Sequence, residues 1–262
     1  MILTTQKILT IQNLTKKFKN GAGVNQVSFA IDKGKIVGFI GDNGAGKTTT
    51  IKLIFGEYKK DKGDVLVDGI AHEKKEALQK ISFFPDQNSY PKHYKIKKYA
   101  YYSASLKGID KKEVDKIYFE LLKALNLEEF AKSKFDELSA GMQKRALLLA
   151  TLVTDPELII LDEPTSNLDV KSRIEFLEVL KFLAEKRNTT IVITSHNIDE
   201  LSSLINEVII IKDGEIQYQN AFDPAKENLR NVYNEHVDSE KSSIQYKRIE
   251  DIFREKEGEN NA

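Results

Sequence analysis

The stretch GDNGAGKT, Gly41–Thr48, carries the most specific chemical pattern in this sequence. It has the spacing G-x-x-x-x-G-K-[ST], in which glycines let the backbone wrap around one anion and the following helix adds the positive end of its dipole. We predict that Lys47 reaches the β- and γ-phosphates of a nucleotide and that the Thr48 hydroxyl holds Mg²⁺. The predicted nucleotide-binding residues of this stretch are Gly41, Asp42, Asn43, Gly44, Ala45, Gly46, Lys47, Thr48 and Thr49.

Two carboxylates follow an apolar run in LIILDEP, Leu158–Pro164. A buried strand would carry Asp162 to the carboxyl end of a sheet, where ligands bind in open α/β folds. We predict that Asp162 is a direct or indirect partner of Mg²⁺ and that Glu163 is the general base for an attacking water. The plainer alternative is that the Asp-Glu pair only caps the next turn.

Two further polar residues follow apolar runs. His196 ends TIVITSH, a strand that we expect beside LIILDE, so it could donate a hydrogen bond to a γ-phosphate or be only a structural hydrogen-bonding group. Gln87, in FFPDQNSYP, follows the run ISFF. Its amide could contact Mg²⁺ or the attacking water, or belong to an ordinary polar loop.

A second anion-binding pattern lies well downstream of the first, in ELSAGMQKRALLLA, Glu137–Ala150. Ser139 is of the type that caps a helix, and Gly141 brings a backbone N–H to the helix start. Read alone, this helix start could bind an anion but has no obvious ligand.

Composition excludes several classes of protein. The 40 basic and 40 acidic residues give zero net charge, so we expect no nucleic-acid partner. Without cysteine the chain has neither disulfides nor thiolate metal sites, which fits a reducing compartment. Its N-terminus lacks a signal-peptide pattern, and its unbroken apolar runs fall far short of the roughly twenty residues of a membrane span. Any work at a membrane therefore needs a partner that crosses it.

The elements that position these residues alternate between strands and helices, which predicts an α/β fold. KIVGFI (Lys35–Ile40), LIILDE and TIVITSH are expected to be buried strands, and GKTTTIKLIFG a helix. From about residue 90 to 150 the pattern becomes helical, and Asp213-Gly214 marks a hairpin. One domain is expected over residues 1–220, followed at 221–262 by a charged tail or a short helical extension.

In their order along the chain, these motifs resemble those of the ATP-binding subunits of ABC transporters. The matching motifs are the loop Gly41–Thr48, the glutamine loop near Gln87, the signature LSAGMQKR, the strand LIILDE, the D-loop Ser166–Asp169 and the histidine His196. The loop alone is shared by many NTPases, but its combination with the signature and LDEPTSNLD is highly specific. The resemblance covers most of the chain.

The resemblance implies a P-loop NTPase core with a mostly parallel sheet, an N-terminal antiparallel β subdomain and an α-helical subdomain that carries the signature. It implies ATP and Mg²⁺ as cofactors, and an aromatic residue that stacks on adenine, for which Phe18 is the best match. Two such domains, identical or different, pair head to tail, so Ser139 and Gly141 would cap the γ-phosphate held by the partner's loop. The pair would drive a membrane-spanning permease as a peripheral subunit on the cytoplasmic face of the membrane.

The motifs also depart from the family pattern. The usual LSGGQ signature is LSAGM here, so Ala140 must have a negative φ, and a contact normally made at Met142 would be lost or supplied by Gln143. The pattern LS-x-GM-x-x-R resembles an efflux-type subfamily whose membrane subunits are separate chains. Alignment from FFP puts Asp86, rather than Gln87, at the glutamine-loop position.

The function expected from these features is ATP binding and hydrolysis that drives a multi-chain exporter. The alternative is an ABC ATPase that acts on a non-membrane partner. A GTPase or a small-molecule kinase would share the loop but does not need LSAGM, and the guanine motif N-K-x-D is absent.

Two segments are open to more than one interpretation. The basic and aromatic run YPKHYKIKKYAYY either faces solvent or meets a membrane subunit or anionic headgroups. Its lysines are Lys92, Lys95, Lys97 and Lys98. In the C-terminal extension, Ile249, Ile252 and Phe253 share one helical face that could serve docking or dimer contacts.

Overall fold

A six-stranded sheet forms the centre of the molecule. In the computed structural model, which describes residues 6–86, 89–195 and 197–237, the strand order is β10-β9-β3-β8-β7-β6. The parallel strands are β3 (Ile36–Ile40), β6 (Ile81–Phe84), β7 (Leu158–Asp162), β8 (Thr190–Thr194) and β9 (Glu207–Lys212), and β10 (Glu215–Ala221) is antiparallel to β9. Parallel strands are covered on both faces, which is why these are mostly apolar. The predicted mostly parallel sheet is confirmed.

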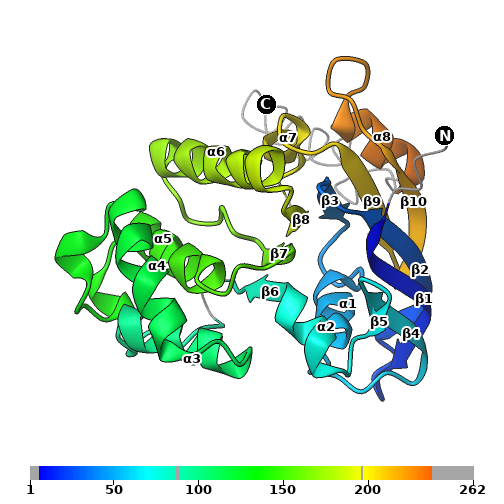
Figure 1. Cartoon of the computed structure of the whole chain (residues 1–262). Coiled ribbons are helices and arrows are strands. Elements are labelled where there is room, and N and C mark those ends of the chain that lie inside the picture. The colour runs from blue at the N-terminus through cyan, green and yellow to red at the C-terminus, as the bar shows by residue number, and fades with distance from the viewer. Residues whose placement is uncertain (1–5, 87–88, 196, 238–262) are drawn as a thin grey trace, which may run out of the picture.

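A second, antiparallel sheet covers one side of this core. Its order is β2-β1-β4-β5, and its strands are β1 (Lys7–Lys17), β2 (Gly23–Asp32), β4 (Lys62–Val67) and β5 (Ile70–Ala71). Inward residues such as Leu9, Val27 and Val65 share one hydrophobic core with Phe39 of β3. Figure 1 shows this sheet at the right of the molecule, beside α1 (Lys47–Ile54) and α2 (Lys75–Lys80). It is the antiparallel subdomain that the family resemblance predicted.

The segment between β6 and β7, here called the helical insert, is helical as predicted. It contains α3 (Ile96–Leu106), α4 (Lys111–Ala124) and α5 (Ala140–Leu152), with 3-10 turns at Glu128–Phe130 and Phe135–Glu137. Asp110 is the N-cap of α4, and its side chain accepts hydrogen bonds from two N–H groups of the first turn. Tyr118 and Phe135 are fully buried in the insert. In Figure 1 the insert forms the green lobe on the left.

Three helices complete the described fold: α6 (Val170–Arg187), α7 (Ile198–Ser202) and α8 (Leu229–His236). The extension expected from residue 221 begins as a packed segment, because Phe222, Leu229 and Val232 are buried in the main core. Ile249, Ile252 and Phe253 lie outside the described residues. Among the helices described, none is both long and apolar enough to cross a membrane.

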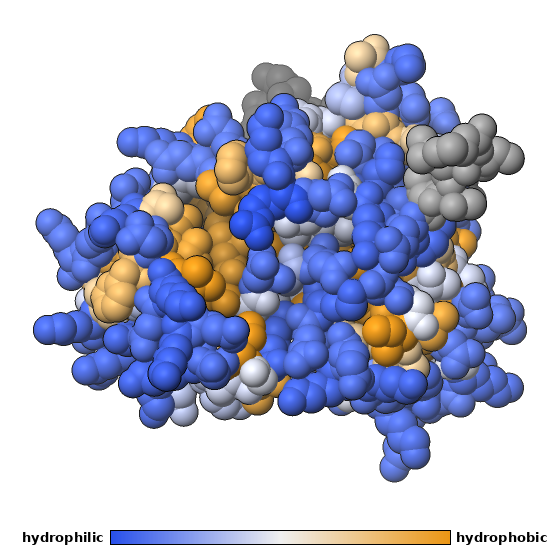
Figure 2. Space-filling model, in the orientation of Figure 1, coloured by the Kyte–Doolittle hydropathy of each residue, from blue (hydrophilic) through white to orange (hydrophobic). Residues whose placement is uncertain are grey.

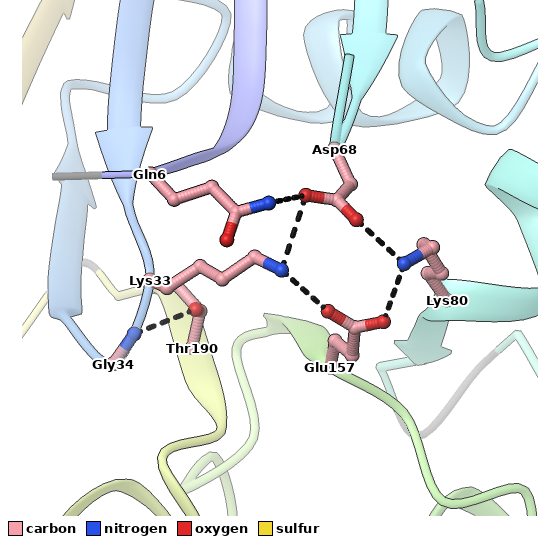
Figure 3. A network of polar contacts seen from close by, with 7 residues as sticks. All are labelled: Gln6, Lys33, Gly34, Asp68, Lys80, Glu157 and Thr190. Carbon is pink, nitrogen blue, oxygen red and sulfur yellow. Dashed lines mark hydrogen bonds and ion pairs between the residues drawn. The ribbon is translucent and has the colours of Figure 1, made fainter. Parts of the chain in front are cut away.

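Four charged side chains, here called the ionic ring, tie the antiparallel sheet to the core (Figure 3). The N–O distances around the ring are 3.1 Å for Lys33–Asp68, 2.6 Å for Asp68–Lys80, 2.7 Å for Lys80–Glu157 and 2.9 Å for Glu157–Lys33. Glu157 immediately precedes β7, and Lys33 lies in the turn before β3. The ring therefore lies at the amino ends of the parallel strands, opposite the edge where ligands are expected.

Candidate nucleotide-binding site

The phosphate loop (Gly41–Thr48) joins the carboxyl end of β3 to the start of α1. Gly46, at the N-terminus of α1, has a φ of +111°, and a Cβ on it would lie 2.9 Å from Val24 Cγ1. A Cβ on Gly41 would lie 2.2 Å from the carbonyl oxygen of Ile211. Only glycine fits these two positions, so the glycine spacing is needed to bring the loop tightly around the helix start.

Lys47 folds back toward its own loop. The side chain is buried, and its Nζ donates hydrogen bonds to the carbonyl oxygens of Gly41 at 2.6 Å and Asp42 at 3.1 Å. Burial lowers the pKa of Lys47, and the nearby carboxylates of Glu163 and Asp162 act in the opposite direction. An ammonium group has three donors, so Lys47 can hold the loop and contact an anion at the same time.

A cavity of about 320 Å³, here called the phosphate cavity, opens at this loop. It joins parts of the chain that are far apart in sequence: the phosphate loop, Asp86 after β6, and the two carboxylates at the end of β7. Its described lining residues are Ala22, Gly23, Asp42, Asn43, Gly44, Gly46, Lys47, Thr48, Thr49, Asp86, Asp162 and Glu163. Gly41 and Ala45 are buried and are not among them.

The two carboxylates are anchored by a residue that sequence reasoning missed. Asp162 Oδ1 accepts a hydrogen bond of 2.7 Å from the Thr194 hydroxyl, and the Glu163 N–H donates to that same hydroxyl at 3.1 Å. Glu163 has a φ of +47°, which is uncommon for a residue with a side chain. Its carbonyl oxygen accepts from Ser166 Oγ at 2.8 Å. The available signal was the hydroxyl at position 194, which follows three apolar residues at the end of the run TIVIT.

Two predicted site residues, Gln87 and His196, lie outside the described residues. Asp86, the alternative glutamine-loop residue, lines the phosphate cavity. The strand that His196 was expected to end, β8, does lie beside β7, with Thr194 opposite Asp162. The contacts of Gln87 and His196 themselves stay predictions.

Ser139 and Gly141 start α5 away from the phosphate cavity. Ser139 is the N-cap, and its hydroxyl accepts a hydrogen bond from the Met142 N–H at 3.3 Å. Ala140 is the first helical residue and so has a negative φ. Gly141 lies against α6, since a Cβ on it would be 2.8 Å from Ser172 Oγ. Neither Ser139 nor Gly141 is among the described residues that line the phosphate cavity.

Gln143 and Lys144 of α5 both make contacts within the chain. The Gln143 amide accepts a hydrogen bond from the Tyr90 hydroxyl at 2.6 Å and donates one to the Leu138 carbonyl at 2.9 Å. Both of these partners belong to the segment between β6 and β7 that contains Gln143. Lys144 is buried, and its Nζ lies 3.5 Å from the Glu163 carbonyl oxygen. Burial lowers the pKa of Lys144 to about 8.

Phe18 follows β1 and is half-buried. Its ring contacts Tyr58, with ring centroids 5.3 Å apart, and Lys16 Nζ lies 5.8 Å from the Phe18 centroid. Ala22, in the same β1–β2 connection, and Gly23, the first residue of β2, line the phosphate cavity, but Phe18 is not among its described lining residues. Stacking of Phe18 on adenine stays a prediction.

The chain is similar to known proteins in sequence. The ABC transporter family model matches residues 24–166, more than half of the 262 residues, and an AAA-domain model matches residues 131–203. The SkfA peptide export ATP-binding protein SkfE of Bacillus subtilis is 36% identical over 80% of this chain and 87% of that protein. The bacitracin transport ATP-binding protein BcrA of Bacillus licheniformis is 33% identical over 85% of this chain and 72% of that protein.

The fold is also similar to solved structures. One is the ATP-binding cassette MJ0796, whose dimer was solved in a post-hydrolysis state with ADP and phosphate. It is 28% identical, the match covers 82% of this chain and 99% of that chain, and the TM-score is 0.71.

Proposed function

Because the chain belongs to the ABC transporter family as an ATP-binding subunit, we propose that it hydrolyses MgATP and thereby drives a separate membrane-spanning partner. The observation that carries this proposal is the single cavity in which the phosphate loop meets Asp162 and Glu163. A pair of carboxylates at a phosphate-binding loop is what hydrolysis requires, because one can serve a metal ion and the other can activate water.

The phosphate loop would bind the β- and γ-phosphates through its backbone N–H groups, the N-terminus of α1 and Lys47. Mg²⁺ prefers oxygen ligands and keeps several waters, and Thr48 and Asp162 offer such oxygens in one cavity, with Asp86 or Gln87 as a further partner. When bound, the ion neutralises phosphate charge during transfer. Phe18 is the proposed adenine contact.

Glu163 is the proposed general base. Its backbone is held on both sides, by Thr194 at the N–H and by Ser166 at the carbonyl, so the carboxylate is carried on a fixed turn at the cavity. A positioned base typically contributes about 10²- to 10⁴-fold in rate. His196 would donate a hydrogen bond to the γ-phosphate.

Glu163→Gln tests the hydrolysis step, because it keeps the shape of the side chain and removes the base. We expect ATP binding to be retained and steady-state phosphate release to fall about 100-fold or more. Lys47→Ala is the contrasting variant and should weaken ATP binding in a direct titration. Turnover at the normal rate by Glu163→Gln would remove Glu163 from the role of base.

We also infer that the working unit is a head-to-tail pair, formed with an identical or a different ATP-binding chain. Ser139 and Gly141, at the start of α5, are not among the described residues that line the cavity of their own phosphate loop. N–H groups at a helix start suit a phosphate, so the γ-phosphate held by a partner's loop is the proposed ligand. That the similar cassette MJ0796 was solved as a dimer with ADP and phosphate supports the formation of a pair.

The membrane partner has a candidate docking groove between the core and the helical insert. A cavity of about 510 Å³ lies there, and Leu78, Phe83 and Leu106 contribute apolar surface from α2, β6 and α3. Lys107 lies in the same wall and donates to the Ser82 hydroxyl at 2.5 Å. Burial lowers the pKa of Lys107 to about 8. A short apolar helix carrying an acidic residue is the kind of segment that fits this groove.

We propose that this partner is an exporter-type permease and that the complex works at the cytoplasmic face of the membrane. The similarity to SkfE, named for SkfA peptide export, and the LS-x-GM-x-x-R pattern support the exporter assignment. The alternative remains an ATPase that acts on a non-membrane partner. A pull-down from detergent extract separates the two: a co-purifying membrane subunit supports the permease, and a stoichiometric soluble partner in its place overturns it.

A further inference from the structure

Thr194 occupies a special place in the core sheet. It is the last residue of β8, it is fully buried, and it lies opposite Asp162 in the parallel pairing of β8 with β7. Its hydroxyl donates to Asp162 Oδ1 at 2.7 Å and accepts from the Glu163 N–H at 3.1 Å. The Thr194 hydroxyl thus contacts both members of the carboxylate pair, because it donates a hydrogen bond to Asp162 and accepts one from Glu163.

The two hydrogen bonds act on different properties of the pair. The bond to Asp162 Oδ1 restrains rotation of that carboxylate, whose oxygens are the ones proposed to face Mg²⁺. The bond from Glu163 satisfies a backbone N–H at a residue with a φ of +47°, a conformation that persists only when its surroundings fix it. Valine has the branched shape of threonine and can make neither bond.

We propose that Thr194 is a positioning residue for the ATPase reaction: it sets the orientation of Asp162 toward the metal and fixes the backbone that carries Glu163. This inference rests on the proposed function. Thr194 itself touches neither nucleotide nor metal in this scheme and acts only through its two neighbours.

The same strand offers a matched control. Thr190, the first residue of β8, is also fully buried, and its hydroxyl accepts a hydrogen bond from the Gly34 N–H at 3.0 Å. Figure 3 shows Thr190 beside the ionic ring. As the first residue of β8 it lies at the amino edge of the sheet, and it is not among the described residues that line the phosphate cavity. Replacing either threonine with valine removes one buried hydroxyl from the same strand, but only position 194 lies at the carboxylate pair.

The test compares Thr194→Val, Thr194→Ser and Thr190→Val in the full chain. We expect Thr194→Val to lower kcat about 10- to 100-fold, the usual effect of removing a group that orients a metal ligand. Thr194→Ser, which keeps the hydroxyl, should stay close to wild type. Thr190→Val should lower the thermal unfolding midpoint as Thr194→Val does and leave kcat unchanged.

A second readout does not depend on turnover. The ratio of ATP affinities measured with and without Mg²⁺ reports how well the protein presents its metal ligands. We expect this ratio to fall about tenfold in Thr194→Val and to be unchanged in Thr190→Val. If Thr194→Val does not fold, Thr194→Cys compared with Thr194→Ser isolates the hydrogen bond, because a thiol is a much weaker donor.

Two results would overturn the proposal: a Thr194→Val protein with wild-type kcat and wild-type Mg²⁺ ratio, or a Thr194→Ser protein as slow as Thr194→Val. The first shows that the hydroxyl is dispensable, and the second that shape rather than hydrogen bonding matters. If wild type and Thr190→Val both lack ATPase activity, the proposed function fails instead, and the Mg²⁺ ratio still decides the role of Thr194.

Discussion

At the scale of single residues, two opposing effects act on the pKa of Lys47. Burial lowers the pKa of its ammonium group, while Glu163 and Asp162 favour the charged form. A triphosphate at the phosphate loop would add negative charge close to Nζ. Nucleotide binding therefore favours the protonated lysine, so the same group that stabilises the loop through the Gly41 and Asp42 carbonyls is ready to bind the anion.

Asp42, in the phosphate loop, is contacted by α8 near the end of the described chain. The Tyr233 hydroxyl, from α8, donates to Asp42 Oδ1 at 2.7 Å. Burial and the Asp42 carboxylate raise the pKa of Tyr233, so the phenol remains a donor at neutral pH. A second contact holds α8 in place, because Arg230 pairs with Asp199 of α7 at 2.5 Å.

Tyr233→Phe removes this donor and leaves the ring. We expect ATP affinity to fall about two- to tenfold, in line with the ~0.5–1.5 kcal/mol net contribution of one hydrogen bond, because Asp42 is then less restrained beside the phosphates. Isothermal titration measures the change. The control is Tyr218→Phe, at a tyrosine whose ring packs on His236 with centroids 4.1 Å apart. Identical affinities in Tyr233→Phe and wild type would contradict this role.

At the scale of elements, α5 connects the signature to the turn that carries Glu163. Its N-terminus carries Ser139, its next turn contacts Tyr90 through Gln143, and Lys144 lies 3.5 Å from the Glu163 carbonyl. One rigid helix thus contacts the segment after β6 and the turn after β7. A ligand at the start of α5 would therefore contact the same helix that reaches Glu163 in the phosphate cavity of its own chain.

The ionic ring joins elements at the other edge of the sheet, and its titration has a definite sign. The hydrogen bond from Lys80 lowers the pKa of Asp68, and burial opposes it. A lowered folded-state pKa means that this contribution to stability is present above the usual value of 3.8 and is lost as pH falls through the folded-state value. The pKa of Lys80 is raised by Asp68, so its contribution is lost only as pH rises beyond 10.5.

Asp68→Asn tests the ionic ring. Asp68 has a φ of +50° in the β4–β5 turn, and asparagine tolerates this conformation, so the variant removes charge without breaking the turn. We expect the free energy of unfolding at pH 7 to fall by about 1 kcal/mol, allowing for solvent screening, and the loss to shrink below about pH 3.8.

Denaturant titrations over a pH series measure this loss. The control is Asp64→Asn, which removes an exposed carboxylate from β4, the strand that precedes the Asp68 turn. A loss in Asp68→Asn that equals the control, or that does not change with pH, would argue against the ionic ring.

At the scale of the whole molecule, the helical insert meets the rest of the chain across two cavities. One is the groove beside Lys107, and the other, of about 340 Å³, lies between α5 and α6 near Gly141. Figure 2 shows apolar surface on the side where α6 faces the insert, where Phe176 and Phe182 line the second cavity.

The four lysines of residues 92–98 are exposed, which fits both interpretations of that segment.

Ser139→Arg tests pairing. A long side chain at the start of α5 fills the space that a partner's γ-phosphate would enter, so ATP-dependent pairing should be lost while nucleotide binding to one chain survives. Light scattering of Glu163→Gln with MgATP should report a dimer, and the double variant a monomer. Ser105→Arg, on an exposed face of α3, is the control. A dimer formed by the Ser139→Arg double variant would exclude this surface from pairing.

The local pattern of the sequence was enough to predict several parts of the molecule. The phosphate loop, the Asp162-Glu163 pair, the Ser139 cap and the helical insert each depend on residues that are close together in the chain. Spacing and periodicity report such features directly, because one turn or one strand contains all the residues involved. The Asp213-Gly214 hairpin turn before β10 was also predictable from adjacent residues, and both of these residues have positive φ.

Only the tertiary structure decided the rest. Thr194 meets Asp162 across 32 residues of sequence, Tyr233 meets Asp42 across 191, and the ionic ring joins four separate segments of the chain. The composition of residues 221–262 left a charged tail and a short helical extension both open, and the tertiary structure shows that α8 is packed and contacts the phosphate loop. Contacts of this kind depend on strand order and register, which place distant residues side by side, and the local pattern of either partner does not contain that information.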